Sequence, residues 1–174
     1  YYEISFNKYD LFYQTMAGYA YSQEFPTADV QYSAAEKAVK RISETGFKSI
    51  RVFMHCPSYL DLMYNEEHRN TYFKAMDQVF DLCDKYGLKM TVCLGLAEEN
   101  LLACDFVEGE GWVQSTETVY DLISNPNCRS RQNVYDYIDI VINRYKDRDT
   151  VLMWEVNNEL SLEVDIGSVF GRVR

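Results

Sequence analysis

The chain has 174 residues, of which 47% are apolar and 15% aromatic, so a single domain over residues 1–174 can bury a substantial core. Its formal net charge is −10 and its basic residues are scattered, which argues against nucleic acid or an anionic membrane surface as a partner. No apolar run approaches the roughly 18 residues of a membrane span.

The first predicted elements occupy the N-terminal third of the chain. Residues 15–21 (TMAGYAY) favour a first strand. Ser33 and Glu36 have the spacing of a capping box, which predicts a helix that begins there and ends near Gly46. The β-branched and aromatic stretch 48–54 (KSIRVFM) then predicts a second strand.

The same order of helix, short turn and strand occurs twice more. Apolar residues at helical spacing predict helices over residues 66–86 and about 134–145. Strands are predicted over residues 88–94 and 151–156, and we expect a long loop over residues 100–126. Buried strands that alternate with amphipathic helices predict an α/β fold with a parallel sheet covered by helices.

The connections differ in length at the two ends of this sheet. Short turns at Gly46, Gly87 and Asp147 precede strands, whereas long loops follow them. Parallel α/β folds place their functional residues at the carboxyl ends of the strands, where the long loops fall. No GxGxxG or P-loop motif occurs, which weakens a Rossmann-type nucleotide site and leaves a flavodoxin-like protein as a minor alternative.

The last predicted strand ends in polar residues. Residues 151–160 read VLMWEVNNEL, and Asn-Asn-Glu has poor strand propensity. This ending resembles the fourth strand of clan A glycoside hydrolases, and GFKSIRVFM (46–54) resembles their second strand. Residues 72–94 resemble the second helix and third strand of family 5 members, the endo-β-mannanases in particular. The resemblance implies a parallel (β/α)8 TIM barrel, of which this chain holds about the first four β/α units.

The resemblance also implies roles for three residues. Glu159 would be the general acid/base, Asn158 would bind the substrate 2-hydroxyl, and Arg51 would lie near the nucleophile. Retaining hydrolysis uses two carboxyl groups about 5–5.5 Å apart. A strand end that is partly removed from water can keep one of them protonated. The implied reaction is retaining hydrolysis of a β-1,4-linked, mannan-like polysaccharide or oligosaccharide, without a cofactor.

Further residues complete the predicted site. His55, Tyr59 and Trp112 lie in predicted strand-end loops, where they could bind the sugar. We expect no metal at His55–Cys56. Glu155 should point to the same side of its strand as Glu159.

Arg51 stands among apolar residues, so it should be buried in an ion pair, either as support for the site or as a purely structural pair. Glu155 is one candidate partner, and Trp154 is expected in the core.

The sequence also departs from the implied family. Leu160 follows Glu159 where Pro is common, and no His ends the third predicted strand. The nucleophile of this clan lies on the seventh strand, so we expect it outside this chain and expect the isolated chain to be inactive. An unpaired edge after the fourth strand should favour a homodimer or a complementary half-barrel.

Two further expectations follow. The alternative function is a non-catalytic carbohydrate-binding or interaction module on a degenerate barrel. We expect a secreted or extracellular protein, although the five cysteines do not decide the compartment.

Overall fold

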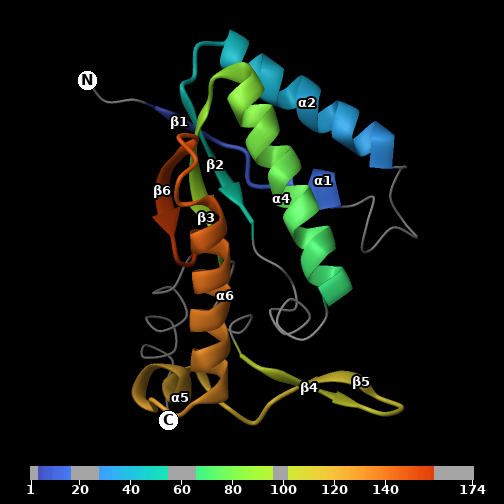
Figure 1. Cartoon of the computed structure of the whole chain (residues 1–174), viewed down its shortest axis with the longest axis vertical. Coiled ribbons are helices and arrows are strands. Elements are labelled where there is room, and N and C mark those ends of the chain that lie inside the picture. Colours follow the sequence, from blue (N-terminus) through green and yellow to red (C-terminus); the bar gives the residue numbers. More distant parts are fainter. Residues whose placement is uncertain (1–3, 17–27, 55–65, 96–101, 159–174) are drawn as a thin grey trace, which may run out of the picture.

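A computed structural model describes residues 4–16, 28–54, 66–95 and 102–158 (Figure 1). Four parallel strands form its main sheet in the order β1 (Ser5–Asn7), β2 (Ser49–Phe53), β3 (Lys89–Cys93) and β6 (Val151–Glu155). The strands follow one another across the sheet in chain order. Doubly wound folds reverse this order at a switch point. The fold is therefore a partial α/β barrel, and the flavodoxin-like alternative is wrong.

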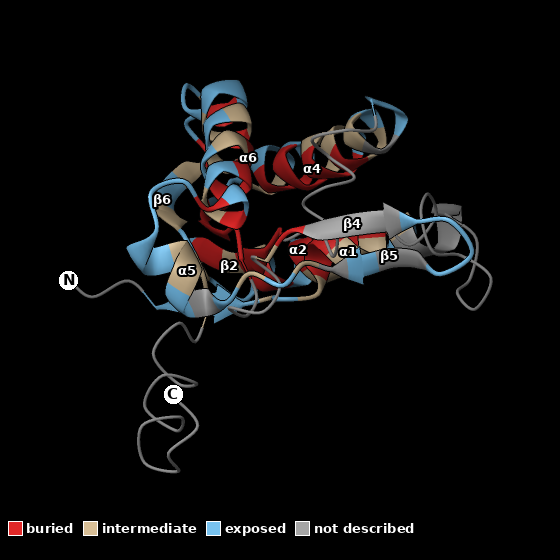
Figure 2. Cartoon of the chain, turned by 90° about the horizontal axis from the view of Figure 1, so that it is seen from below, coloured by how far each residue is buried: buried red, intermediate tan, exposed pale blue. Residues whose placement is uncertain are grey.

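Helices pack against this sheet. The described helices are α1 (Leu11–Met16), α2 (Ala28–Glu44), α4 (Glu66–Tyr86), α5 (Val119–Ser124) and α6 (Arg129–Tyr145), of which α5 packs on α6. Figure 2 shows the buried residues concentrated where the helices face the strands. Ile50, Val52, Met90 and Val92 contribute the strand side of this core. Burial of these apolar faces, rather than helix propensity, stabilises the arrangement.

Most of the predicted elements are confirmed. The strands predicted over 48–54, 88–94 and 151–156 and the helix over 66–86 appear with similar bounds. Gly46 and Gly87 follow α2 and α4 with φ of 97° and 67°. A side chain would be strained at these values, which explains why glycine ends both helices.

Helix α6 begins without help from its own N-cap residue. Cys128 makes no side-chain capping bond there. Instead, the Glu117 carboxylate accepts hydrogen bonds from the backbone N–H groups of Arg129 and Ser130 at 2.7 and 2.8 Å. Burial raises the Glu117 pKa, but these bonds and the Ser130 hydroxyl outweigh it and leave that pKa lowered. The buried Ser130 hydroxyl also accepts from the Ala103 N–H, so Glu117 ties the helix to the preceding segment.

Charged pairs fix α6 and its following turn against α4. Arg144 Nη2 lies 2.8 Å from Asp77 Oδ2. Arg148 donates to Asp84 at 2.8 Å and to Asp81 at 2.9 Å. The Thr150 hydroxyl also donates to Asp84, just before β6 begins. The register of the last strand is therefore tied to α4.

Three predictions about elements are wrong. Thr15 and Met16 belong to α1 rather than to a first strand, because the Thr15 hydroxyl bonds to the Phe12 and Ala75 carbonyls; the first strand lies at Ser5–Asn7. Residues 17–21 of that prediction lie outside the described residues. Ser33 is inside α2, which begins at Ala28, so it caps nothing.

The third wrong prediction is the long loop over residues 100–126. Its described part contains a hairpin of β4 (Cys104–Val107) and β5 (Gly111–Gln114), followed by α5. Gly109, with φ of 89°, makes the hairpin turn.

Candidate functional site

The candidate site lies on the face of the sheet that the helices leave uncovered. Ile50 and Val52 enter the helix-side core, so the intervening Arg51 and the following Phe53 point to the opposite face. The register aligns Phe53 with Cys93, and Cys93 with Glu155. In a closed barrel this is the inner face.

Arg51 reaches across β3 to a carboxylate on β6. Its Nε lies 2.7 Å from Glu155 Oε2 and its Nη2 lies 2.8 Å from Glu155 Oε1, a bidentate pair. The side chains retain 24% and 32% of their exposure, so the pair is only partly removed from water. The hydrogen bonds from Arg51 lower the Glu155 pKa against the opposing effect of burial. Glu155 is therefore an ionised partner, as one sequence interpretation expected.

The same guanidinium also holds Asn158. Arg51 Nη2 donates to Asn158 Oδ1 at 3.0 Å. The strand ladder continues beyond β6, because the Leu94 N–H donates to the Glu155 carbonyl at 2.8 Å and the Asn158 N–H to the Gly95 carbonyl at 3.1 Å. The structure thus brings Arg51 and Asn158 together at the carboxyl end of the sheet.

Gly95 makes room for the residue before Asn158. A Cβ at position 95 would lie 2.1 Å from Asn157 Oδ1 and 3.0 Å from the Val156 carbonyl oxygen. Both polar side-chain atoms of Asn157 are buried and lack a hydrogen-bond partner among the described residues. The backbone path after β6 therefore depends on glycine at the end of β3.

Two buried tyrosines bind the carbonyls at the strand ends. Tyr72 donates to the Met54 carbonyl at 2.7 Å. The Tyr137 hydroxyl lies 3.2 Å from the Met54 and Leu94 carbonyl oxygens and 2.9 Å from the Tyr72 hydroxyl. The sequence predicted a helix over about residues 134–145, which contains Tyr137, but did not predict this role. The only sign of this role in the sequence is that a tyrosine, with a hydroxyl to satisfy, stands where an apolar residue could fill the same space.

Cys93 lies between the charged residues of the site. Burial, with Glu155 adding to it, raises the pKa of its thiol to about 11. The thiol stays protonated near neutral pH and donates to the Gly95 carbonyl at 3.1 Å. A protonated thiol is a weak nucleophile, so Cys93 is not expected to act as one.

The other predicted site residues remain without a described side chain. Glu159, His55 and Tyr59 lie outside the described residues. Trp112 lies on β5 rather than in a loop, and its side chain is not described. Trp154 packs partly buried against the core, close to its predicted place.

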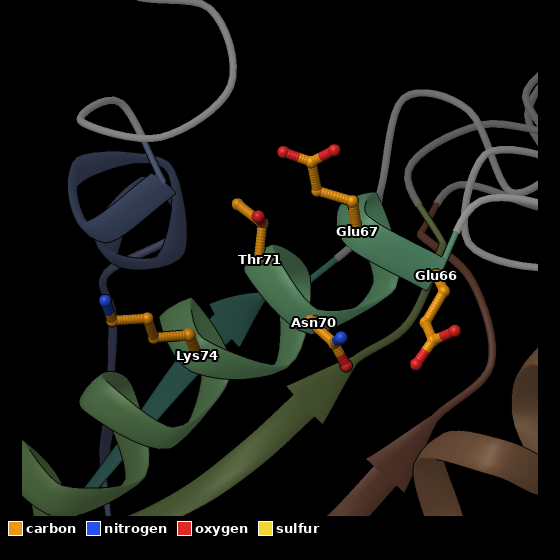
Figure 3. A pocket seen from close by; sticks show the side chains of 5 residues that line it. All are labelled: Glu66, Glu67, Asn70, Thr71 and Lys74. Carbon is orange, nitrogen blue, oxygen red and sulfur yellow. The ribbon is translucent and has the colours of Figure 1, made fainter.

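Other features of the described residues bear on binding chemistry. Within ranges 4–16, 28–54, 66–95 and 102–158, no group of three or more metal-binding side chains occurs. In that same part of the chain, no helix has the length and apolarity to cross a membrane. An open hollow at the start of α4 is lined by Glu66, Glu67, Asn70, Thr71 and Lys74 (Figure 3). It shares no residue with the Arg51 site.

Comparison with known proteins decides the family. The family model of the TIM barrel domain of glycosyl hydrolases family 2 matches residues 60–173, more than half of the chain. The chain belongs to this family. No curated protein sequence matches it. The glycoside hydrolase barrel is confirmed.

The match corrects the finer assignment, because it is to family 2 rather than family 5. The family 5 interpretation depended on short patterns at strand ends and in one helix–strand unit. Such short patterns indicate which chemistry the end of a strand supports, but they do not decide which glycoside hydrolase family the chain belongs to.

Proposed function

We propose that this family 2 barrel carries the acid/base side of a retaining glycosidase site. The observation that supports it best is the contact of Arg51 Nη2 with Asn158 Oδ1 at 3.0 Å, at the carboxyl end of β6. Parallel barrels build their active sites at this end. Asn158 immediately precedes Glu159 in the sequence, and the proposal therefore assigns the acid/base role to Glu159.

In this proposal Glu159 donates a proton to the leaving glycosidic oxygen and later accepts one from water. Asn158 holds the hydroxyl next to the reacting carbon. Arg51 lies near the nucleophile and helps to keep that carboxylate ionised. These roles are the ones that the resemblance to clan A glycoside hydrolases implies, and the position of Asn158 beside Arg51 supports them.

Glu155 does not supply the second carboxylate in this proposal. Among the described residues that end β2, β3 and β6, it is the one carboxylate, and both of its oxygens accept from Arg51. A nucleophile must reach the anomeric carbon, whereas the Glu155 carboxylate is turned toward Arg51. We therefore place the nucleophile outside the described residues.

The substrate class is part of the same proposal. We propose a β-1,4-linked, mannan-like glycan, the substrate expected from the sequence, as the first substrate to test. His55, Tyr59 and Trp112 are proposed to contact its sugar rings, because aromatic faces pack against the apolar faces of sugars.

The test is hydrolysis by the full-length gene product. A panel of aryl β-glycosides and β-1,4-linked manno-, gluco- and galacto-oligosaccharides would define the substrate. Proton NMR of the first product would define its anomeric configuration. We expect the β-anomer to form first, as retention requires. Inversion would overturn the mechanism, and binding without any hydrolysis would point to a carbohydrate-binding module.

We also propose that the 174-residue chain alone is inactive. A closed barrel of this type takes about 250 residues and eight strands. The described part of this chain forms four parallel strands. Assay of the isolated chain beside the full-length product on the same substrate tests this, and equal kcat/KM would contradict it.

A further inference from the structure

The Arg51 guanidinium is shared by two acceptors from β6 and its continuation. Its Nη2 donates both to Glu155 Oε1 at 2.8 Å and to Asn158 Oδ1 at 3.0 Å, and its Nε donates to Glu155 Oε2 at 2.7 Å. The Glu155 pair uses the planar fork of the guanidinium, which sets both the place and the tilt of the group.

Phe53 and Cys93 hold the same guanidinium from other directions. The guanidinium carbon lies 4.5 Å from the centre of the Phe53 ring, within cation–π range. Nη2 is 3.9 Å from Cys93 Sγ. Glu155 makes the short, charged contacts, so it is the group whose removal would free Arg51 to turn.

The shared guanidinium decides which way the Asn158 amide faces. A guanidinium has donors only, so the amide must present its oxygen to Arg51 and its NH2 group away from Arg51. The backbone of Asn158 is fixed separately by its bond to the Gly95 carbonyl. The orientation of this amide thus depends on Arg51, and the orientation of Arg51 depends on Glu155.

We infer that Glu155 is a positioning residue that acts through Arg51 to set the Asn158 amide with its NH2 group toward the substrate. The site would then recognise the sugar hydroxyl next to the reacting carbon as a hydrogen-bond acceptor. Glu155 itself touches no substrate in this arrangement. The inference rests on the proposed function, because it assigns the partner of Asn158 in the same site.

Kinetics on the full-length gene product test the substrate part of this inference. Glu155→Gln and Arg51→Lys would be assayed on an aryl glycoside and on its 2-deoxy analogue. Lys keeps the charge of Arg51 but lacks the fork that binds both acceptors. We expect each variant to lose about 10-fold to 100-fold of the wild-type preference for the 2-hydroxyl substrate, because misplacing a contact by about 1 Å has effects of that size.

A double-mutant comparison adds a second readout. Asn158→Ala should lower kcat/KM of the wild type strongly but lower that of Glu155→Gln far less, because the amide is already misplaced. Glu110→Gln, which changes an exposed residue of the hairpin turn, is the matched control and should keep the wild-type preference. Full preference in Glu155→Gln, or additive losses, would overturn the inference.

An NMR measurement on the full-length gene product, without substrate, tests the positioning without any activity. The side-chain amide signals of Asn158 should shift or broaden in Glu155→Gln and in Arg51→Lys, and stay in place in Glu110→Gln. Unchanged Asn158 signals in both site variants would overturn the inference. A wild-type enzyme without glycosidase activity would instead overturn the proposed function, so the two failures are distinguishable.

Discussion

At the scale of single residues, the site depends on one close approach between strand ends. Gly95 follows β3, and the Asn157 side chain occupies the space that a Cβ of residue 95 would need. A backbone hydrogen bond to the Gly95 carbonyl fixes Asn158. Through these two contacts, the end of β3 fixes the position of the Asn158 backbone.

Gly95→Ala should therefore damage both stability and activity. The new Cβ would overlap Asn157, and overpacking of this kind costs about 1–3 kcal/mol. Denaturant unfolding and kcat/KM on the same sample would show both losses. Gly46→Ala is the control: apart from its chain neighbours, no atom of the described residues lies within 4 Å of its Cβ, but φ is +97°, so it should cost stability alone. Equal activity in the two variants would contradict this account.

The Arg51–Glu155 pair predicts a dependence on pH. The folded pKa of Glu155 is lowered by Arg51, so its contribution to stability is present above the unfolded carboxyl pKa. That contribution is lost as the pH falls through the folded value. Glu155→Gln should reduce the free energy of unfolding by about 1–3 kcal/mol at pH 7. The difference from wild type should shrink toward pH 3, as urea unfolding at several pH values would show.

The control for that experiment is Glu110→Gln, an exposed change outside the pair. It should stay within about 0.5 kcal/mol of wild type at every pH. A Glu155→Gln effect that is the same at pH 7 and pH 3 would mean that the pair does not stabilise the fold through its charge.

At the scale of elements, α4 carries the carboxylates that hold the approach to β6. Arg148 bonds to Asp84 and Asp81 at similar distances, but only Asp84 also receives the buried Thr150 hydroxyl. The Asp81 side chain is 66% exposed. Asp84 and Asp81 therefore bind the same arginine but differ in burial, so variants at the two positions can be compared directly.

Asp84→Ala should lower the free energy of unfolding by about 1–3 kcal/mol, because a buried hydroxyl loses its acceptor. Asp81→Ala removes an exposed pair and should cost at most about 1 kcal/mol. Thermal or denaturant unfolding of both variants measures the difference. A larger loss for Asp81→Ala would contradict the proposed role of Thr150.

The sequence predicted those elements whose patterns are regular and locally bounded. Gly46 and Gly87 marked helix ends because only glycine takes their φ values without strain. The capping box at Ser33 failed because α2 extends back to Ala28, so the local signal lay inside a longer helix. The first strand failed because Ser5–Asn7 is only three residues long and exposed, without a buried apolar pattern to reveal it.

The site was predictable in its residue types but not in all of its contacts. The Asn-Glu ending and Arg51 stood out as polar residues within apolar strands. The tyrosine pair of Tyr72 and Tyr137 could not be predicted, because it joins two helices that are far apart in the sequence. The capping of α6 by Glu117 could not be predicted either, because Glu117 lies 12 residues before Arg129 in the sequence.

At the scale of the whole molecule, the described sheet has an apolar edge. β6 pairs with β3, and Leu152, Met153 and Val156 are 57%, 55% and 57% exposed. Exposed strand edges with apolar side chains favour association. We propose that the isolated chain self-associates through β6 or binds a complementary half-barrel there.

Light scattering across a concentration series tests that association. The isolated wild-type chain should show a mass that rises with concentration. Leu152→Lys combined with Met153→Lys should shift it toward the monomer, since a charge on an edge strand opposes pairing. Tyr120→Lys, which changes a residue that is 73% exposed on α5, is the control and should behave as wild type. A wild-type chain that stays monomeric throughout would contradict the proposal.

The central claim concerns Glu159, and the leaving-group dependence of Glu159→Ala tests it most directly. Loss of the proton donor lowers kcat/KM strongly when the leaving group is poor, because that group must be protonated as it departs. The loss is small when the leaving group is activated. With the full-length gene product, we expect kcat/KM on an unactivated glycoside to fall by about 10²–10⁴-fold, the usual contribution of general acid catalysis. On a dinitrophenyl glycoside the fall should be much smaller. Equal losses on both substrates, or no loss on either, would contradict the assignment of Glu159 as the acid/base.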